Sequence, residues 1–427
     1  MINVTFCAYD KPDNVGGPVA WIQRLLPALR THGVESRCLV MTHWGDTGPT
    51  LAALQAQGFD CPTVACHEHT EDRLRWILAR LRENPPDVFV PNLVVAGYLA
   101  ARWVRSAGIP TVGILHSDDA FYRGLQQQFV FGRREFRLSA LVCVSRELEQ
   151  QVRARRPQHT MTRRIPYGVP LPPQEQRRSP QLRVAYVGRL AEEQKRISEV
   201  TRVLCRVVRE VPGTEAVLYG DGPDARAVER ILATDGAHLP VHLVGRIESD
   251  DVQKELLGCD VIILLSDYEG LPIALMEAMA CGCVPVCLRM RSGIPELVED
   301  GVTGLLVDNR ADSVVAAIRR LRDDSALREQ LARAARARIE AEYSSEGSTA
   351  LWAQLLTQLH APSGARRVID RARWMSLPAV DPGLASADVR QPSPMSPAHL
   401  YGRGRMIAGR IKRRLLGQAL AHAPTVK

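Results

Sequence analysis

The sequence predicts an α/β protein built from two Rossmann-like, doubly wound domains. Short apolar runs alternate with stretches of helical periodicity through most of the 427 residues, a pattern typical of parallel sheets covered by helices on both faces. The stretch at 170–180 is rich in proline and charge and lacks periodicity, as expected for an interdomain linker. The chain also exceeds the roughly 250–300 residues at which a single hydrophobic core usually divides.

The first domain is expected to span residues 1–172. Short apolar runs favour buried strands, and apolar residues at helical spacing favour amphipathic helices. Strands are predicted at 2–8, 36–41, 87–90, 110–115 and 140–144, and helices at 18–32, 71–83, 94–107 and 120–138.

The same pattern restarts in a second domain, expected at 181–345. Strands are predicted at 182–187, 215–219, 241–244, 261–265 and 284–288, and helices at 311–323 and 325–342 close the domain. A last helix is expected at 346–361, because Trp352 and several leucines fall on one stripe there.

Residues 362–427 are expected to form a flexible basic tail, because prolines recur between 378 and 397 among Ser and Ala. The formal net charge of +8 belongs to this tail, since residues 1–361 are close to neutral. Nucleic acid is therefore not an expected partner of the body. Arg403–Leu416 places three apolar residues at helical spacing among basic ones, which fits either a peripheral membrane contact or a basic disordered end.

A cytoplasmic location is expected. The N-terminus has no basic segment ahead of its first apolar stretch, as a signal peptide would have. The longest nearly apolar run, 89–101, is too short to span a bilayer. The ten cysteines are scattered through predicted core strands without a compact disulfide spacing.

The most specific motif is a pair of glutamates, Glu269 and Glu277, at the end of a predicted strand. A helix is expected to start near Leu271 or Pro272, so that the free amides of its first turn can bind an anion. Glu277 lies a little over two turns into this helix and can present a carboxylate to ribose hydroxyls. Glu269, on the loop before the helix, is placed to meet a sugar. Two exposed glutamates at such a position are unremarkable on their own.

Two cations follow the first strand of the second domain. Arg189 stands directly after this strand, and Lys195 comes six residues later. Two such cations beside a helix N-terminus can balance the charge of a diphosphate without a metal, although exposed Arg and Lys are more often solvated. The chain has no Asp-x-Asp pair for holding a divalent ion on a nucleotide-sugar.

Weaker signals come from glycine turns and one histidine. Gly16 and Gly17 precede the first helix and could present amides to an anion, and Gly220-Asp221-Gly222-Pro223 forms a turn after another strand. His116 follows the strand at 110–115, so we expect it at the carboxyl edge of the first sheet, facing the cleft. Each of these features alone is as well explained by local structure.

Taken together, these motifs resemble those of the family 4 retaining glycosyltransferases, over about residues 1–360. The family's E-x7-E motif matches Glu269 and Glu277, and its diphosphate-binding pair matches Arg189 and Lys195. The resemblance implies the GT-B fold, in which two Rossmann-like domains face each other across a cleft.

The resemblance also implies roles for other residues. His116 resembles the family's cleft histidine that contacts the donor sugar, and with Glu269 it forms the expected catalytic set. Gly16 is expected at the acceptor loop. The expected donor-binding residues are Gly17, Arg189, Lys195, Gly270, Leu271, Ile273 and Glu277. Two residues depart from the family pattern: Tyr167 stands where Asn is common, and Arg196 stands where Gly is common.

The implied activity is metal-independent transfer of a hexose from a nucleotide-sugar to a glycan, lipid-linked or small-molecule acceptor, with retention of anomeric configuration. No cofactor is expected, because the nucleotide-sugar is a substrate. Two other readings stay open: a nucleotide-sugar epimerase or hydrolase of the same fold, and a membrane-surface adaptor that binds sugar-nucleotide without catalysis. A cluster of Cys61, Cys66, His67 and His69 has poor zinc spacing, so no metal site is expected.

Overall fold

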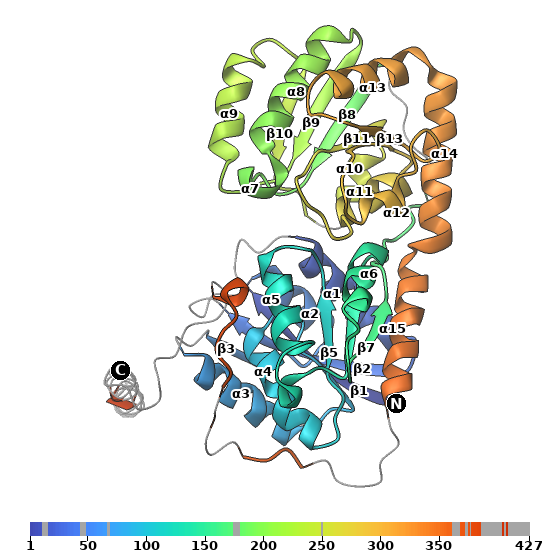
Figure 1. Ribbon diagram of the computed structural model, residues 1–427. Coiled ribbons are helices and arrows are strands. Elements are labelled where there is room, and N and C mark those ends of the chain that lie inside the picture. The colour runs from blue at the N-terminus through green and yellow to red at the C-terminus, as the bar shows by residue number, and fades with distance from the viewer. Residues whose placement is uncertain are drawn as a thin grey trace, which may run out of the picture.

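The computed structural model describes residues 1–10, 16–42, 48–65, 69–173, 180–248, 251–360, 368–371, 375, 377–385, 404 and 407–408. The described chain forms two α/β domains stacked end to end, with two long helices running along one side of both (Figure 1). All strand pairs are parallel, so the predicted fold class of two doubly wound domains is confirmed.

The first domain contains two parallel sheets that meet at an isolated bridge between Phe89 and Thr111. The first sheet has the order β3-β2-β1-β4 and the second the order β5-β6-β7. The strands are β1 (Ile2–Asp10), β2 (Val34–Thr42), β3 (Thr63–Ala65), β4 (Val88–Val90), β5 (Val112–Leu115), β6 (Ala140–Cys143) and β7 (Met161–Arg164). The helices are α1 (Gly17–Arg30), α2 (Pro49–Ala56), α3 (Thr70–Glu83), α4 (Val95–Ser106), α5 (Ala120–Phe129), the short η1 (Arg134–Phe136) and α6 (Arg146–Ala154).

The helix predicted at 120–138 is wrong beyond residue 129. The chain leaves α5 at Phe129 and forms η1 before β6. Gly132 lies so close to the end of α5 that a Cβ there would be 2.3 Å from the carbonyl oxygen of Gln128. A glycine just past a helix end is a common termination signal.

The second domain holds one six-stranded sheet of order β10-β9-β8-β11-β12-β13. Its strands are β8 (Leu182–Val187), β9 (Thr214–Tyr219), β10 (Val241–Gly245), β11 (Val261–Leu264), β12 (Val284–Leu288) and β13 (Leu305–Val307). Its helices are α7 (Glu192–Lys195), α8 (Ile197–Glu210), α9 (Ala225–Thr234), α10 (Val252–Leu256), α11 (Ile273–Ala280), α12 (Ile294–Leu297), α13 (Asp312–Asp323) and α14 (Ser325–Glu342). The strand order reverses between β8 and β11, and ligands of such sheets bind outside the carboxyl ends of the strands at that point.

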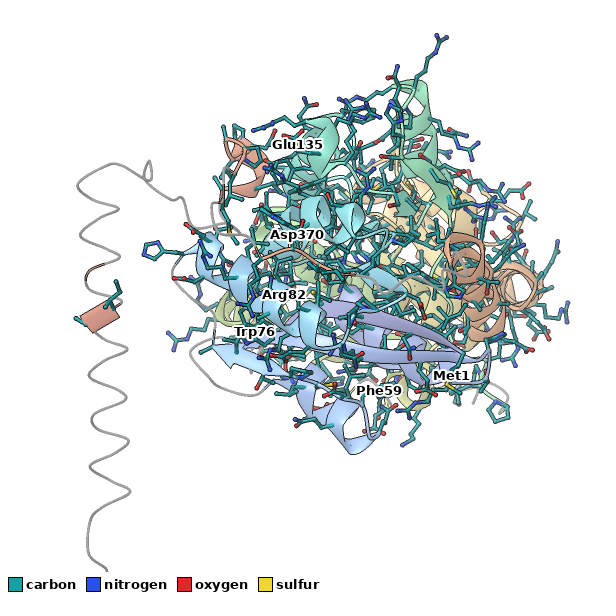
Figure 2. The ribbon with its side chains drawn as sticks, turned by 90° about the horizontal axis from the view of Figure 1, so that it is seen from below. Met1, Phe59, Trp76, Arg82, Glu135 and Asp370 are labelled. Carbon is teal, nitrogen blue, oxygen red and sulfur yellow. The ribbon has the colours of Figure 1, made fainter. Side chains whose placement is uncertain are left out.

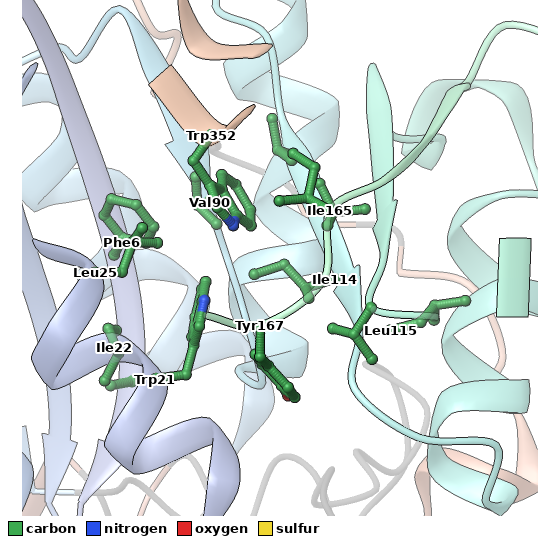
Figure 3. Packing of buried hydrophobic residues seen from close by; sticks show 14 of the residues in the cluster. Phe6, Trp21, Ile22, Leu25, Val90, Ile114, Leu115, Ile165, Tyr167 and Trp352 are labelled. Carbon is green, nitrogen blue, oxygen red and sulfur yellow. The ribbon is translucent and has the colours of Figure 1, made fainter. Parts of the chain in front are cut away.

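The chain crosses between the domains twice, and the two crossings lie side by side. The amide of Val169 donates to the carbonyl of Tyr343 at 3.0 Å, and the amide of Ser345 donates to the carbonyl of Val169 at 3.0 Å. The last helix, α15 (Ser345–Leu359), then returns to the first domain and packs against α1. Trp352 of α15 and Trp21 of α1 lie with ring centroids 5.6 Å apart, and Tyr167 lies beside Trp21 (Figure 3). The domain limits predicted from the sequence stay a prediction.

Part of the C-terminal segment packs on the first domain and forms a strap, defined here as residues 368–371 and 377–385. Ile369 and Leu384 are buried. Arg82 of α3 donates to the carbonyl of Asp370 at 3.3 Å, and these residues are neighbours in Figure 2. The prediction of a flexible tail is therefore wrong for the strap, because its apolar side chains are inserted in the body.

The strap is seated mainly on α5. The amide of Asp381 donates to Oε1 of Gln128 at 2.9 Å, just before the short η2 (Pro382–Leu384). A Cβ on Gly124 of α5 would lie 2.9 Å from Oδ1 of Asp381 and 3.0 Å from Cγ of Leu384. Glycine at this position therefore lets the strap approach the helix backbone.

The nine cysteines in the described part of the chain are all buried, with free thiols. Within the same part, no helix combines the length and hydrophobicity that crossing a bilayer requires.

Candidate functional site

The candidate site lies where the carboxyl ends of the strands of both domains meet. Gly270, between β11 and α11, packs against the loop after β5: a Cβ on Gly270 would be 2.0 Å from the carbonyl oxygen of His116. A Cβ on Gly17, at the start of α1, would be 3.4 Å from Cδ1 of Ile273 at the start of α11. The structure thus brings together predicted site residues from the two domains.

Glu269 is held by Lys195. The ammonium of Lys195 donates to Oε1 of Glu269 at 2.5 Å, and the two side chains are 15% and 8% exposed. The neighbouring loop is fixed by the side-chain amide of Gln194, whose Nε2 donates to the carbonyl of Tyr268 at 2.9 Å. Glu269 is a largely buried carboxylate that is compensated by a cation, as buried charges require.

Arg189 occupies the loop after β8. Its residue is exposed, and its carbonyl accepts from the hydroxyl of Tyr186 at 2.9 Å. No ion pair of its guanidinium is found among the residues that the structure describes, so this cation is available to an anionic ligand.

The glycine turn after β9 supports the Arg189 loop. A Cβ on Gly220 would lie 1.9 Å from the carbonyl oxygen of Gly188, and one on Gly222 would lie 2.4 Å from that of Leu190. These glycines are therefore explained by the close packing of two neighbouring loops.

Glu277 lies in α11 and is buried against α1. Its Oε1 is 2.6 Å from Nη2 of Arg24, which comes from the first domain. Burial raises the pKa of Glu277, and Arg24 acts in the opposite direction. Arg24 was not predicted from the sequence, because no local pattern indicates which residue of α1 faces α11.

The loop before α11 combines free amides with buried hydroxyls. The helix begins at Ile273, with Pro272 as its N-cap, one or two residues later than predicted. Its first amides therefore have no acceptor within the helix. The hydroxyls of Ser266 and Ser117 are buried nearby and have no hydrogen-bond partner within the described residues. Sequence reasoning missed both serines, because a lone Ser at a strand end carries no specific signal.

The ring of His116 packs against side chains of the first domain, and its predicted place at the cleft stays a prediction. The ring is buried, with Nε2 2.8 Å from Oδ1 of Asn92 and Nδ1 hydrogen-bonded to the hydroxyl of Tyr167. If the amide oxygen of Asn92 accepts from Nε2–H, Nδ1 must accept from Tyr167. Burial lowers the pKa of His116 to about 3, so the ring is neutral. Its backbone carbonyl lies against Gly270 of the other domain.

The two departures from the family pattern are both visible in the structure. Tyr167 stacks on His116 at an interplanar angle of 13°, and its hydroxyl is hydrogen-bonded to Nδ1 of His116. Arg196 has φ +52 between α7 and α8, which explains why glycine is common there. The guanidinium of Arg196 forms an ion pair with Glu199.

Several predicted features fall partly outside the described residues. Cys66 and His67 of the candidate metal cluster are among these, and within the described ranges no group of three metal-ligating side chains comes together. Of Arg403–Leu416, only residues 404, 407 and 408 are described, as helical and exposed. The membrane contact stays a prediction.

Comparison with known proteins connects this geometry to a family. The model of the family described as "Glycosyl transferases group 1" matches residues 171–338, and that of "Glycosyltransferase Family 4" matches residues 15–171. The amylovoran biosynthesis glycosyltransferase AmsK of Erwinia amylovora is 33% identical over 42% of this chain and 45% of its own length. The alpha-D-kanosaminyltransferase of Streptomyces kanamyceticus is 30% identical over 38% of this chain and 42% of its own. The matched region thus spans less than half the length of either relative.

Solved structures share the fold. HepE of Anabaena, crystallised with UDP and glucose, has a TM-score of 0.66 at 18% identity, covering 84% of this chain and all of its own. The sucrose-phosphate synthase of Thermosynechococcus elongatus has a TM-score of 0.68 at 18% identity, covering 85% of this chain and all of its own. The two family models meet at residue 171 and together match most of the chain. The chain therefore belongs to the family 4 glycosyltransferases.

Proposed function

We propose that the protein transfers a hexose from a nucleotide-sugar to a glycan, lipid-linked or small-molecule acceptor, with retention of anomeric configuration. The observation that carries this proposal is that Arg189, Lys195, Glu269 and Glu277 all follow β8 or β11, the two strands between which the strand order reverses, with the Lys195–Glu269 ion pair joining the two segments. The relatives named above carry sugar-transfer names, and the HepE crystal held UDP and glucose.

In this proposal the donor binds mainly to the second domain. The diphosphate is held by Arg189, by Lys195 and by the amides of Gly270, Leu271 and Ile273, because a helix start and two cations stabilise an anion. The three N–H donors of Lys195 let it contact a phosphate while it stays on Glu269. A metal ion is then not needed for charge balance.

The rest of the donor would contact the two glutamates. Glu277 accepts hydrogen bonds from the ribose hydroxyls, and Glu269 orients the hexose. The carbonyl of His116 and the buried hydroxyl of Ser117 belong to the first domain, and the buried hydroxyl of Ser266 follows β11 of the second domain. The acceptor enters from the first domain, past Gly16 and Gly17 at the start of α1.

The proposed reaction breaks the bond between the anomeric carbon and the diphosphate oxygen. The acceptor oxygen bonds to the same face of that carbon, and its proton passes to the departing phosphate. No carboxylate nucleophile is required, so Glu269 is a positioning group. Closure of the two domains excludes water, which would otherwise hydrolyse the donor.

The proposal is tested by a thermal-shift screen of UDP-, GDP- and ADP-sugars in the presence of a chelator. We expect one nucleotide class to stabilise the wild type, with the shift lost in Glu277→Ala and retained in Glu299→Ala, whose side chain is 59% exposed in the same domain. A shift that survives Glu277→Ala, or no shift with any donor, would count against the donor site.

Product analysis then separates the remaining readings. A glycosyltransferase gives an acceptor-linked sugar, an epimerase or hydrolase gives altered or free sugar without an acceptor, and an adaptor gives no turnover. Glu269→Gln should lose transfer and keep donor affinity; full transfer by this variant would remove Glu269 from the mechanism.

We also propose a cytoplasmic protein that contacts the membrane surface through Arg403–Leu416, which would suit a lipid-linked acceptor. Co-sedimentation with anionic vesicles, with and without residues 400–427, tests this. Equal pelleting of the two forms would discard the membrane contact.

A further inference from the structure

Helices α1 and α11 face each other across the two domains. Their first turns approach at Gly17 and Ile273. Arg24 lies seven residues after Gly17, close to two full turns, so both residues lie on the same face of α1. Further along this contact, Nη2 of Arg24 is 2.6 Å from Oε1 of Glu277.

The carboxylate of Glu277 is only 6% exposed, and the guanidinium of Arg24 is 23% exposed. A buried carboxylate is costly unless it is paired and hydrogen-bonded. The second domain supplies the carboxylate, and the first domain supplies its cation. The ion pair therefore depends on the closed arrangement of the domains.

We infer that Arg24 is a positioning residue of the nucleotide site: it aims the Glu277 carboxylate at the ribose, so that the first domain completes this site on closure. The inference rests on the proposed function, in which Glu277 binds ribose. A carboxylate offers about four lone-pair positions, so one contact from Arg24 leaves room for both hydroxyls of the ribose. Arg24 can then stay in place when the donor binds.

The surroundings of Glu277 also make its charge depend on Arg24. Burial raises the pKa of Glu277, and the one charged group found to oppose this within the described chain is Arg24. Cys281, at the end of α11, keeps a neutral thiol because burial raises its pKa to about 12. From α14, Arg336 donates to the carbonyl of Ala280 at 2.7 Å. Removal of Arg24 should therefore favour protonation of Glu277.

The test measures binding by titration calorimetry, using whichever of UDP, GDP and ADP stabilises the wild type, between pH 6 and pH 9. In Arg24→Gln we expect binding to weaken roughly 10- to 100-fold at pH 7, the usual effect of losing a hydrogen bond to a charged group. This binding should recover as the pH rises and Glu277 ionises. Arg24→Lys should keep most of the affinity.

Two controls separate positioning from general damage to the fold. Arg30→Gln alters the last turn of α1, where Arg30 contacts the carbonyl of Gln57 in its own domain, and should bind as the wild type does. The 2′,3′-dideoxy form of the same nucleotide lacks the hydroxyls that Glu277 would hold, so its weaker binding should not change in Arg24→Gln.

The inference is overturned if Arg24→Gln binds the nucleotide as tightly as the wild type at every pH, or if it loses affinity equally for the dideoxy form. A wild type that binds none of the three nucleotides overturns the proposed function, and this inference with it. If the wild type binds a nucleotide and Arg24→Gln binds it equally well, only the inference about Arg24 is overturned and the proposed function stands.

Discussion

Replacing Gly270 with alanine should hold the cleft open without unfolding either domain. The added Cβ would lie 2.0 Å from the carbonyl oxygen of His116 and 3.0 Å from Cα of Ser117, and both atoms belong to the backbone of the first domain. The shortest favourable distance between a carbon and a carbonyl oxygen is roughly 3.3 Å. The two surfaces must therefore separate by more than about 1 Å.

The size of the effect follows from where this clash falls. Overpacking a close contact costs about 1–3 kcal/mol. Because the domains can move apart, the cost opposes closure and leaves folding nearly unchanged. The population of the closed state, and with it kcat/KM for transfer, should fall by roughly 5- to 150-fold.

The assay compares kcat/KM and the midpoint of thermal unfolding in Gly270→Ala with those in a control variant. Gly258→Ala places its Cβ 3.4 Å from the nearest neighbour, the carbonyl oxygen of Glu255, which is ordinary contact, and should keep most activity. The reasoning is refuted if Gly270→Ala transfers sugar at the wild-type rate, or if its loss of activity comes with a large fall in the unfolding midpoint.

Three further predictions concern stability. His116 has a pKa of about 3 when folded and an ordinary value of 6.5, so the unfolded state binds the proton first and stability falls as the pH drops below 6.5. Between pH 6.5 and pH 5 the free energy of unfolding should fall by ~2 kcal/mol for this reason. Urea unfolding at both pH values measures this fall, and an equally steep pH dependence in His116→Gln would contradict the assignment to His116. Tyr167→Phe leaves Nδ1 of buried His116 without its hydroxyl partner and should cost about 1–3 kcal/mol in the same assay; an unchanged free energy of unfolding would show that this bond contributes nothing. Leu384→Ala removes a fully buried side chain and should lower the free energy of unfolding by roughly 2–5 kcal/mol or release the strap. Limited proteolysis at 368–385 would detect a released strap. Wild-type stability together with wild-type protease resistance would contradict the packing of Leu384.

The architecture was predictable because the parallel strands are short, apolar and separated by amphipathic helices. The loop and helix around Glu269 and Glu277 were also predictable, since both lie within one strand-loop-helix unit. The helix end at Phe129 was missed because the apolar pattern continues past it, although Gly132 signalled the stop.

The contacts between distant segments were not predictable. Arg24 meets Glu277 across two domains, and no local pattern indicates which residue of α1 faces α11. Asn92 and Tyr167 hold His116 from separate loops, so the orientation of this ring depends on tertiary packing.

The strap was mispredicted for a related reason. Its composition is that of a flexible segment, and Leu384 is an isolated apolar residue without periodicity. Its binding depends on Gly124 and Gln128 of α5, which are far away in the sequence. The amino-acid composition of this segment therefore indicates its local flexibility, but it does not indicate that the segment packs on α5.

The central claim is that the donor lies between the Arg189 loop, the start of α11 and Glu277. A crystal structure with the nucleotide-sugar selected by the thermal-shift screen tests it most directly. We predict the diphosphate on Arg189, Lys195 and the amides of 270–273, with the ribose hydroxyls on Glu277. A nucleotide bound elsewhere, or bound here with its ribose away from Glu277, would contradict the account.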